Sequence, residues 1–256
     1  MFGFMRFDWI QTGGASHEES DERVRRRRGA WGGGAWAQEY GVVPAEYANT
    51  NGTSSFLYMV TTGRTYQMQI NASELTQFVG KNLTGLTWRL NANAANWPPS
   101  VNADFANFDI YIGPGVDPAA RSTTFANNFT SAPTQVRSGP LTFAAGSFQG
   151  AGSPAPWGVE ITFNEYLYTG GHLTIEIRHS GMTGNTTTTS FNALSTTTSG
   201  YGTRFSALWT GTYNGTTGGA GNFFVTRLTA NEVPAPGALA LLGAGLVMGG
   251  RRRRRA

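Results

Sequence analysis

Short segments in which apolar and polar residues alternate recur through the middle of the chain, and this pattern restricts the fold more than any other feature. The clearest segment is GHLTIEIRH, residues 171–179, in which Leu173, Ile175 and Ile177 share one face. Successive side chains of a β-strand point to opposite faces, so the alternation predicts a strand with one buried face. The same criterion predicts strands at residues 56–61, 64–70, 83–90, 105–112, 135–143, 159–163, 190–194, 204–209 and 222–228.

About ten short strands at such close spacing are typical of an antiparallel all-β domain. Glycine accounts for 35 of the 256 residues and charged residues for only 13%, while aromatic residues make up 12%. Glycine suits tight turns, and this aromatic content is too high for a disordered chain. We therefore predict an all-β fold, a single antiparallel β-sandwich of jelly-roll type over residues 38–231.

One short helix is predicted at about residues 72–79, within the segment NASELTQFVG. Asn71 can cap its N-terminus, with Glu74 at the reciprocal position of a capping box, and Gly80 can take the left-handed conformation that ends a helix. Its apolar side chains are expected to face the sandwich; they are Leu75, Phe78 and Val79.

The charge of the chain divides it into three parts. Residues 1–37 carry six arginines and five acids (+1), residues 38–231 carry eight basic groups and nine acids (−1), and residues 232–256 carry five arginines and one acid (+4). The net charge of +4 therefore belongs to the ends of the chain rather than to the predicted domain. Binding to phosphates requires a basic surface on the folded domain, so we predict no nucleic-acid partner.

The C-terminal part contains three successive features. A Pro-x-Pro motif comes first (Val233, Pro234, Ala235, Pro236), an uncharged apolar run follows at residues 237–250, and a cluster of arginines comes last (Arg251, Arg252, Arg253, Arg254, Arg255). As a helix, the run would be about 21 Å long, against about 30 Å for the hydrocarbon core of a bilayer. We predict a short C-terminal membrane helix whose lipid-facing residues include Gly237, Leu239, Leu241, Leu242, Leu246, Val247 and Met248.

This order of Pro-x-Pro, short apolar helix and terminal arginines resembles the PEP-CTERM sorting tail of bacterial envelope proteins. The family has Pro-Glu-Pro where this chain has Pro-Ala-Pro, and the nearest acid is Glu232. The resemblance implies export across the inner membrane of a Gram-negative-type bacterium that makes extracellular polysaccharide, anchoring by the tail, and processing by an exosortase-type membrane enzyme. Residues 64–78, 83–90 and 121–143 also resemble uncharacterised ectodomains that precede such tails, and that likeness brings no activity or site residues with it.

The N-terminal part, residues 1–37, fits an export signal poorly. Its basic residues 23–28 and the sequence Ala35-Trp36-Ala37, a cleavage site that would free Gln38, suit a signal peptide, but only a short, glycine-rich stretch separates them. Two explanations stay open: the signal is degenerate, or the true start of translation lies elsewhere and the first ~30 residues are not made.

Acidic pairs that could hydrolyse a glycosidic bond are poorly placed in this sequence. Glu160 and Glu165 are five residues apart, an odd separation that sends them to opposite faces of a strand. Asp104 and Asp109 have the same odd separation, and we predict a loop position for Asp104 and an outward position for Asp109. A glycosidase needs two carboxyl groups on either side of one bond, so we predict no catalytic residues.

Metal and cofactor sites are not predicted either. The chain has no cysteine, which excludes disulfides, zinc thiolates and cysteine nucleophiles. His172 and His179 also have an odd separation and are expected on opposite faces of one strand. We predict no cofactor. A structural Ca²⁺ ion held by loop aspartates and carbonyl oxygens is common in such folds and stays open as an alternative, but no string of acidic loop residues in the sequence supports it.

Aromatic residues in predicted loops are the candidates for ligand binding, because an exposed ring can stack on the face of a sugar. The alternative is that these rings fasten loops to the sandwich with only their polar tips in water. The candidates are Trp97, Trp157, Tyr166, Tyr168 and Tyr213.

The sequence thus favours an exported, non-enzymatic protein of the cell surface or extracellular matrix with a structural or adhesive role. A carbohydrate-binding module that recognises extracellular polysaccharide through its loop aromatics is the alternative, and a glycoside hydrolase comes third.

Overall fold

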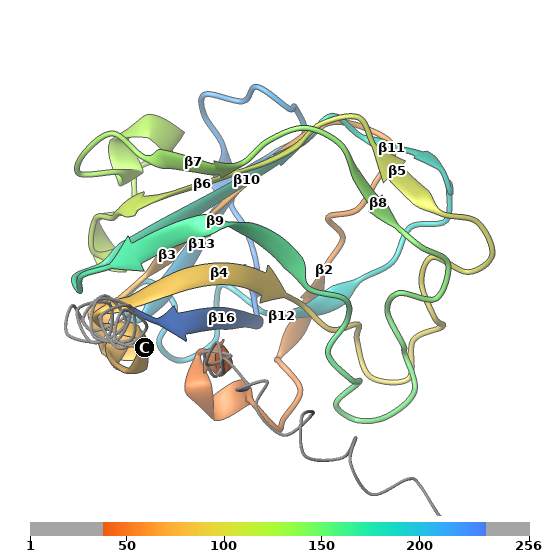
Figure 1. Cartoon of the computed structure of the whole chain (residues 1–256), viewed down its shortest axis with the longest axis horizontal. Helices are drawn as coiled ribbons and strands as arrows, with labels where there is room; N and C mark the ends of the chain where they lie inside the picture. Colours follow the sequence, from red (N-terminus) through yellow and green to blue (C-terminus); the bar gives the residue numbers. More distant parts are fainter. Residues whose placement is uncertain (1–37, 234–256) are drawn as a thin grey trace, which may run out of the picture. The chain divides into compact units, whose positions relative to one another are not determined.

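Antiparallel sheets make up the part of the chain that the computed structural model describes, residues 38–233 (Figure 1). A four-stranded sheet contains, in spatial order, β1 (Gln38–Val43), β16 (Thr226–Glu232), β4 (Lys81–Thr87) and β9 (Ile161–Tyr168). A six-stranded sheet contains β14 (Gly219–Ala220), β13 (Phe205–Thr210), β3 (Arg64–Ile70), β10 (Leu173–His179), β6 (Phe108–Pro114) and β7 (Thr134–Arg137).

Two three-stranded sheets complete this part of the chain. One contains β11 (Met182–Gly184), β5 (Ala103–Phe105) and β8 (Leu141–Phe143), and the other contains β15 (Phe223–Phe224), β12 (Phe191–Leu194) and β2 (Ser54–Phe56). Neighbouring strands in all four sheets are antiparallel. The prediction of an all-β, antiparallel fold is confirmed.

The four- and six-stranded sheets pack against each other through buried aromatic and apolar side chains. The four-stranded sheet lies in front in Figure 1, and its strand β16 reaches the other sheet where the Thr226 hydroxyl lies 3.5 Å from the Met68 sulfur. The Trp88 indole N–H donates to the same hydroxyl at 3.1 Å, and the rings of Tyr66 and Phe224 are 4.7 Å apart between their centroids. Packed aromatic rings and fully buried aliphatic residues dominate the energetics of such a core.

The alternation in β10 explains why this strand lies in the middle of its sheet. Ile175 pairs with Met68 of β3 on one side and with Ile112 of β6 on the other, and all three side chains are fully buried. Cross-strand apolar pairs of this kind stabilise a sheet most where both neighbours are present. The inward residues predicted from the sequence, Leu173 and Ile177 among them, are all buried.

The helix predicted at about residues 72–79 was wrong in three details: its type, its capping box and the burial of Val79. Two 3₁₀-helices, η3 (Ala72–Glu74) and η4 (Thr76–Phe78), replace the single predicted helix. Asn71 does cap η3 by accepting from the Ser73 N–H, but the Glu74 carboxylate accepts from Arg204 instead of closing a capping box. Leu75 and Phe78 are buried and Gly80 is left-handed as predicted, whereas Val79 is 51% exposed.

Strand boundaries also differ from the predicted ones. β9 continues through Asn164 to Tyr168, because it pairs with β4 on both sides of a bulge. Residues 57–60 are not in a strand, although Tyr58 and Met59 are fully buried. The predicted strand at 135–143 is two strands, β7 and β8, in different sheets.

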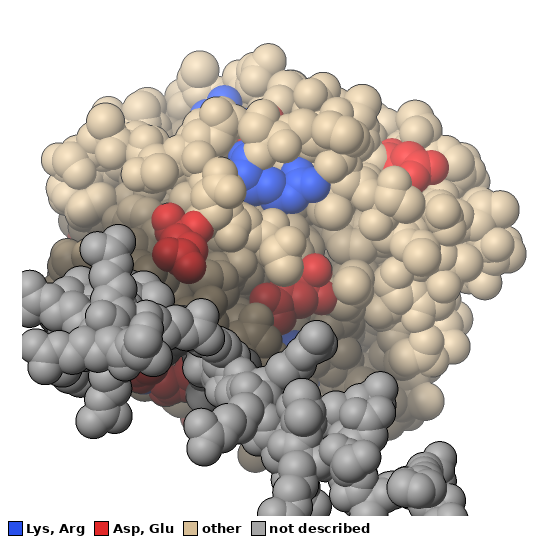
Figure 2. All heavy atoms as spheres, viewed as in Figure 1, with Lys and Arg blue, Asp and Glu red and all other residues tan. Residues whose placement is uncertain are grey.

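The remaining 3₁₀-helices are η2 (Ala45–Tyr47), η5 (Pro118–Ala120) and η6 (Phe125–Asn128). Within residues 38–233 there is no helix with the length and apolar character needed to span a bilayer. The predicted C-terminal membrane helix and the N-terminal part, residues 1–37, lie outside the described residues. Figure 2 shows a small basic patch with acidic groups around it on one face, while most of the visible described surface is uncharged.

One buried imidazole lies at the end of β10, in the core. His179 has none of its surface exposed, and its ring lies 4.7 Å from the ring of Tyr58 between centroids. Its Nδ1 accepts from the Gly181 N–H at 3.1 Å, so its Nε2 carries the proton and donates to the Tyr58 carbonyl at 3.0 Å. Burial lowers the pKa of His179 from 6.5 to about 4.

This shift predicts a loss of stability in mild acid. At pH values between the folded pKa of about 4 and the ordinary pKa of 6.5, the imidazole of His179 is protonated in the unfolded chain but not in the folded one. The free energy of unfolding should therefore fall by about 2 kcal/mol as the pH is lowered from about 7 to about 5. Urea unfolding across this range measures it. In His179→Gln, whose amide can replace both hydrogen bonds, the titrating group is gone.

The difference between the pH profiles of stability of the wild type and of His179→Gln isolates the contribution of His179. Burial raises the pKa of Glu176, which changes stability with pH in the opposite direction, and Glu176 is present in both. Identical pH profiles for the wild type and the glutamine variant would contradict the prediction.

Candidate functional site on the outer face of the six-stranded sheet

A row of polar residues on β3 faces away from the core. Thr65, Gln67 and Gln69 alternate with the core residues of this strand, yet all three are fully buried. Two loops cover them: the β6–β7 loop, residues 115–133, and the β13–β14 loop, residues 211–218. Buried polar groups must be hydrogen-bonded, so this row determines where the two loops lie.

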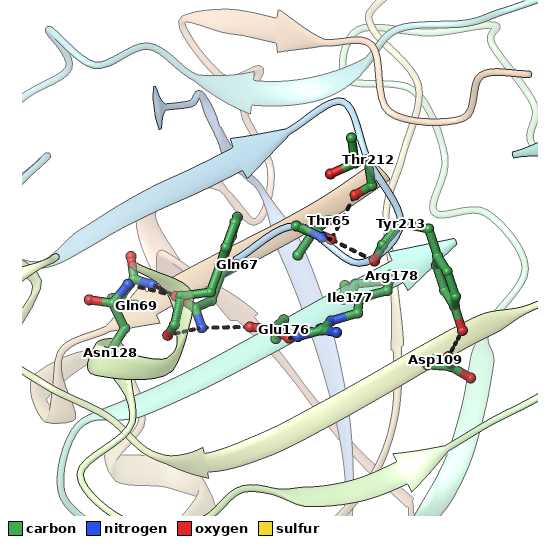
Figure 3. A network of polar contacts seen from close by, with 12 residues as sticks. Thr65, Gln67, Gln69, Asp109, Asn128, Glu176, Ile177, Arg178, Thr212 and Tyr213 are labelled. Carbon is green, nitrogen blue, oxygen red and sulfur yellow. Dashed lines mark hydrogen bonds and ion pairs between the residues drawn. The ribbon is translucent and has the colours of Figure 1, made fainter. Parts of the chain in front are cut away.

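Gln67 joins three parts of the chain through its carboxamide (Figure 3). Its Nε2 donates to the Phe125 carbonyl in the β6–β7 loop at 3.0 Å and to the Glu176 carboxylate on β10 at 2.9 Å. Its Oε1 accepts from the amides of Asn128 at 2.7 Å and Gln69 at 2.8 Å. A glutamine amide has two donors and two acceptor lone pairs, and all four are used here.

Thr65 holds the second loop in the same way. Its hydroxyl accepts from the Gly215 N–H at 3.2 Å and lies 2.8 Å from the carbonyl oxygens of both Thr212 and Tyr213, which share its single O–H donor. The two loops are also bonded to each other, since the Phe125 N–H donates to the Thr216 carbonyl at 3.0 Å. The loops therefore form a connected frame over one part of the sheet.

Glu176 and Arg178 lie beside this frame, on the outward face of β10. Glu176 is 2% exposed, and its Oε1 accepts from the Arg178 Nε at 2.6 Å. Burial raises the pKa of this carboxyl group, and Arg178 and Gln67 act against that rise by bonding to the charged form. The Arg178 guanidinium lies 5.3 Å from the centre of the Tyr111 ring on β6, a cation–π contact.

Asp109 provides a second buried carboxylate on this face. It lies directly opposite Arg178 in the pairing of β6 with β10 and is 5% exposed. One of its oxygens accepts from the Gly139 N–H at 3.1 Å and the other accepts from the Tyr213 hydroxyl. Burial, together with this bond, raises the pKa of Tyr213 to about 12.

A cleft of about 730 Å³ opens between the sheet and the loops. Tyr111, Glu176 and Arg178 line it from the sheet, residues 124–126 and 129–133 from the β6–β7 loop, and residues 214–216 from the β13–β14 loop. The cleft thus combines aromatic rings, those of Phe129 and Tyr111, with one convergent pair of charged groups. A concave, largely apolar site with a few placed polar groups is the usual form of a small-molecule site.

Two of the aromatic residues predicted to bind ligand are buried, which corrects those predictions. Trp97 is 1% exposed, its indole N–H donates to the Thr187 carbonyl at 2.7 Å, and its ring packs on Phe148. Tyr168 is 2% exposed in β9, and its hydroxyl donates to the Gly171 carbonyl. Neither ring can stack on a sugar, because other parts of the protein cover it.

The other three predicted aromatic residues are half-buried. The Trp157 ring already carries two guanidinium groups, those of Arg89 at 4.8 Å and Arg227 at 5.5 Å from its centre. Tyr166 lies in β9 rather than in a loop. Of the five residues, only Tyr213 is bonded to the outer face of the six-stranded sheet, through Asp109.

The acidic residues considered in the sequence lie apart from one another. Glu165 is in β9, exposed, and accepts from the Asn82 amide at 2.8 Å, and Glu160 precedes that strand. Asp104 is in strand β5 instead of a loop and accepts from the Thr142 hydroxyl at 2.6 Å. Asp109 does face outward, as predicted, but it is buried.

His172 lies in the loop before β10, where its Nδ1 accepts from the Ala72 N–H at 3.2 Å, far along the strand from His179. In the described part of the chain, no three histidine, aspartate or glutamate side chains are grouped as metal ligands.

The sorting motif falls at the limit of the structure. Val233 is the last described residue and is 43% exposed. The rest of the motif (Pro234, Ala235, Pro236), the apolar run and the arginine cluster lie outside the described residues.

Most of the cleft is not apparent from the sequence. The alternation in residues 171–179 leaves Glu176 and Arg178 opposite the buried face of their strand, but it does not bring them together with Gln67, Asn128 or Phe129. A signal was present in the segment RTYQMQI, where threonine and two glutamines occupy every outward position of a strand. Such a row indicates a second, polar layer of packing on that face.

Comparison of the chain with protein-family models, with curated proteins and with solved structures finds no match.

The role of Gln67 can be tested by Gln67→Met, which keeps the length of the side chain. The substitution leaves the Glu176 carboxylate, the Phe125 carbonyl and two amides each short of one hydrogen bond. We expect the free energy of unfolding to fall by about 3 kcal/mol, measured by urea titration. Gln135→Met, at an exposed position of β7, is the matched control and should change it by less than about 0.5 kcal/mol. Equal effects of the two substitutions would show that the network does not hold the loops.

Proposed function

We propose that this chain is an exported, non-enzymatic protein of the cell surface or extracellular matrix that adheres to polysaccharide through the cleft on its six-stranded sheet. The single observation that carries the binding proposal is the cleft itself, in which Phe129 and the pair of Arg178 with the buried Glu176 converge. The proposal of export rests on residues 233–256, through their resemblance to a PEP-CTERM sorting tail.

We also propose that the domain is a single jelly-roll sandwich. Eight strands in chain order are β1, β3, β4, β6, β7, β9, β10 and β16. One sheet has the order β1, β16, β4, β9, which are the first, eighth, third and sixth of these strands. The other has the order β3, β10, β6, β7, which are the second, seventh, fourth and fifth, and β13 and β14 are added beside β3. This alternation between sheets is the order of a jelly roll, an architecture that lectin domains also use. The likeness in architecture supports a fold, whereas the function rests on the site.

The chemistry of the cleft suits a sugar. A sugar ring has a face of C–H groups that packs on an aromatic ring, and an edge of hydroxyls that both donate and accept. Phe129 offers a ring, Arg178 offers N–H donors, and Glu176 offers acceptor lone pairs at the same place. Hydrogen bonds to charged groups are about twice as strong as neutral ones, so this pair would orient the bound sugar.

Binding is favoured over hydrolysis by the state of the two carboxylates on this face. Glu176 already bonds to Arg178 and Gln67, and Asp109 already bonds to Gly139 and Tyr213. A glycosidase needs one carboxylic acid ready to protonate the leaving oxygen and a second carboxylate facing the sugar or a water. In both carboxylates, each oxygen already accepts a hydrogen bond from the protein. This arrangement fits a structural and ligand-positioning role instead.

In the cell, the proposal places the domain outside the inner membrane, in the cell envelope, on the cell surface or in the matrix. Its partners would be an exosortase-type membrane enzyme that processes the tail, the membrane itself through the apolar run, and extracellular polysaccharide through the cleft.

Deletion of residues 233–256 tests the sorting part of the proposal. Without the apolar run, the protein should be released in soluble form instead of reaching the surface, as followed by fractionation and immunoblotting. Ala235→Glu, which restores Pro-Glu-Pro, is the control and should keep the surface location. An unchanged distribution of the truncated protein would refute sorting by the tail.

Phe129→Ala tests the binding part. Removing this ring from the cleft should lower the affinity for the bound polysaccharide by about three- to tenfold, the value of one aromatic contact. Affinity electrophoresis over a panel of polysaccharides, followed by calorimetry on the best of them, measures it. Tyr40→Ala, which removes a half-exposed ring from the other sheet, should leave the affinity unchanged. If no polysaccharide of the panel shows saturable binding, the binding part of the proposal is refuted and only the structural role remains.

A further inference from the structure

We propose that the cleft selects neutral saccharides and rejects uronic acids, because its arginine is already paired with a buried glutamate of the protein. This inference rests on the proposed carbohydrate binding and adds the chemical class of the ligand to it. Arg178 is the guanidinium that lines the cleft, and it turns two of its nitrogens, Nε at 2.6 Å and Nη2 at 2.5 Å, towards Glu176 Oε1.

A ligand carboxylate would have either to displace Glu176 from Arg178 or to share the one guanidinium with it, which brings two negative charges together. The Glu176 side chain is 3% exposed, and without Arg178 it would keep only the bond from Gln67. A buried carboxylate left without its cation is strongly unfavourable, because desolvation is then not offset by an ion pair.

The charges around Arg178 also oppose an anionic ligand. On β6, Asp109 lies directly opposite Arg178, so this face carries a second buried carboxylate besides Glu176. The outward residues of β3 are Thr65, Gln67 and Gln69, and the β13–β14 loop carries no charged residue. Like charges placed this close disfavour a third carboxylate.

Two other arginines near this face form hydrogen bonds with backbone carbonyls outside the cleft. Arg121 of the β6–β7 loop donates to the Ala207 carbonyl at 2.6 Å and does not line the cleft. Arg137 of β7 lies over the Phe108 ring and donates to the carbonyls of Gly139 and Pro140. Neither can supply the positive charge that a uronate would need.

A neutral sugar uses the same pair without breaking it. Within the described residues, no group accepts a hydrogen bond from Arg178 Nη1, so a sugar hydroxyl can accept from it. The same or a neighbouring hydroxyl can donate to Glu176 Oε1 or Oε2, since each carboxylate oxygen has more than one lone pair. Both bonds involve a charged partner, and they form while the Glu176–Arg178 pair stays intact.

The experiment is a specificity switch. Neutral hexose hexasaccharides of several linkages are compared with the same compounds oxidised at C6 to uronic acids, by calorimetry at neutral pH and low salt. The wild type should bind the neutral member of a pair at least about tenfold more tightly. Glu176→Gln keeps the shape but frees the charge of Arg178, and it should shift the ratio towards the uronate by about tenfold or more.

Two further variants complete the test. Glu165→Gln removes the same charge from an exposed position of the other sheet and should leave the ratio at its wild-type value. Asp109→Asn removes the second carboxylate of the face and should also raise uronate affinity, which keeps the test decisive if Glu176→Gln does not fold.

The outcomes separate this inference from the proposed function. Uronates that bind the wild type as tightly as neutral sugars, or a ratio unchanged in both Glu176→Gln and Asp109→Asn, overturn the inference while carbohydrate binding stands. If neither class of sugar binds the wild type, the proposed function fails and the inference fails with it.

Discussion

The carboxamide of Gln67 is the interaction on which the rest of the outer face depends. It lies fully buried on a strand whose other face forms the core, and it uses every donor and acceptor it has. A neutral group with two donors and two acceptors can join a strand, a loop carbonyl, an amide and a carboxylate at one point. An apolar residue at this position would leave these partners unsatisfied, and a charged one would add a desolvation penalty.

The cleft follows from this arrangement because loops, not strands, make its walls. Loop residues normally lie at the surface and move more than the sheet beneath them. Here the β6–β7 loop is bonded to Gln67 and Thr174, the β13–β14 loop to Thr65, and the two loops to each other. The Glu176–Arg178 pair therefore lies on the sheet between two loops that are hydrogen-bonded to the sheet and to each other. The same strand, β3, carries the core on one face and the site on the other, so damage to either affects both.

Much of the fold, and little of the site, could be predicted from sequence. The alternation in residues 171–179 correctly gave the inward residues of β10, because burial on one face of a strand leaves that pattern directly in the sequence. The prediction that Trp97 binds ligand was wrong because its ring is buried. The sequence around a loop tryptophan looks the same whether its ring is exposed or buried. Residues 72–79 form two 3₁₀-helices instead of the single predicted helix, and Glu74 bonds to Arg204, 130 positions away, instead of closing a capping box. Capping rules consider only neighbouring residues and cannot include such a partner.

By itself, the sequence determined the strand-rich class, the face on which each side chain lies, the near-neutral charge of the domain and the likeness of its tail to a sorting signal. These properties depend on residues close together in the chain or on simple sums of charge. Only the tertiary structure decided that the outward row of β3 is buried and that Glu176 meets Gln67, 109 positions away. A period of two residues specifies which face a side chain occupies, but it carries no information about what packs on that face. That is decided by contacts between distant segments, which form only when the loops close over the sheet.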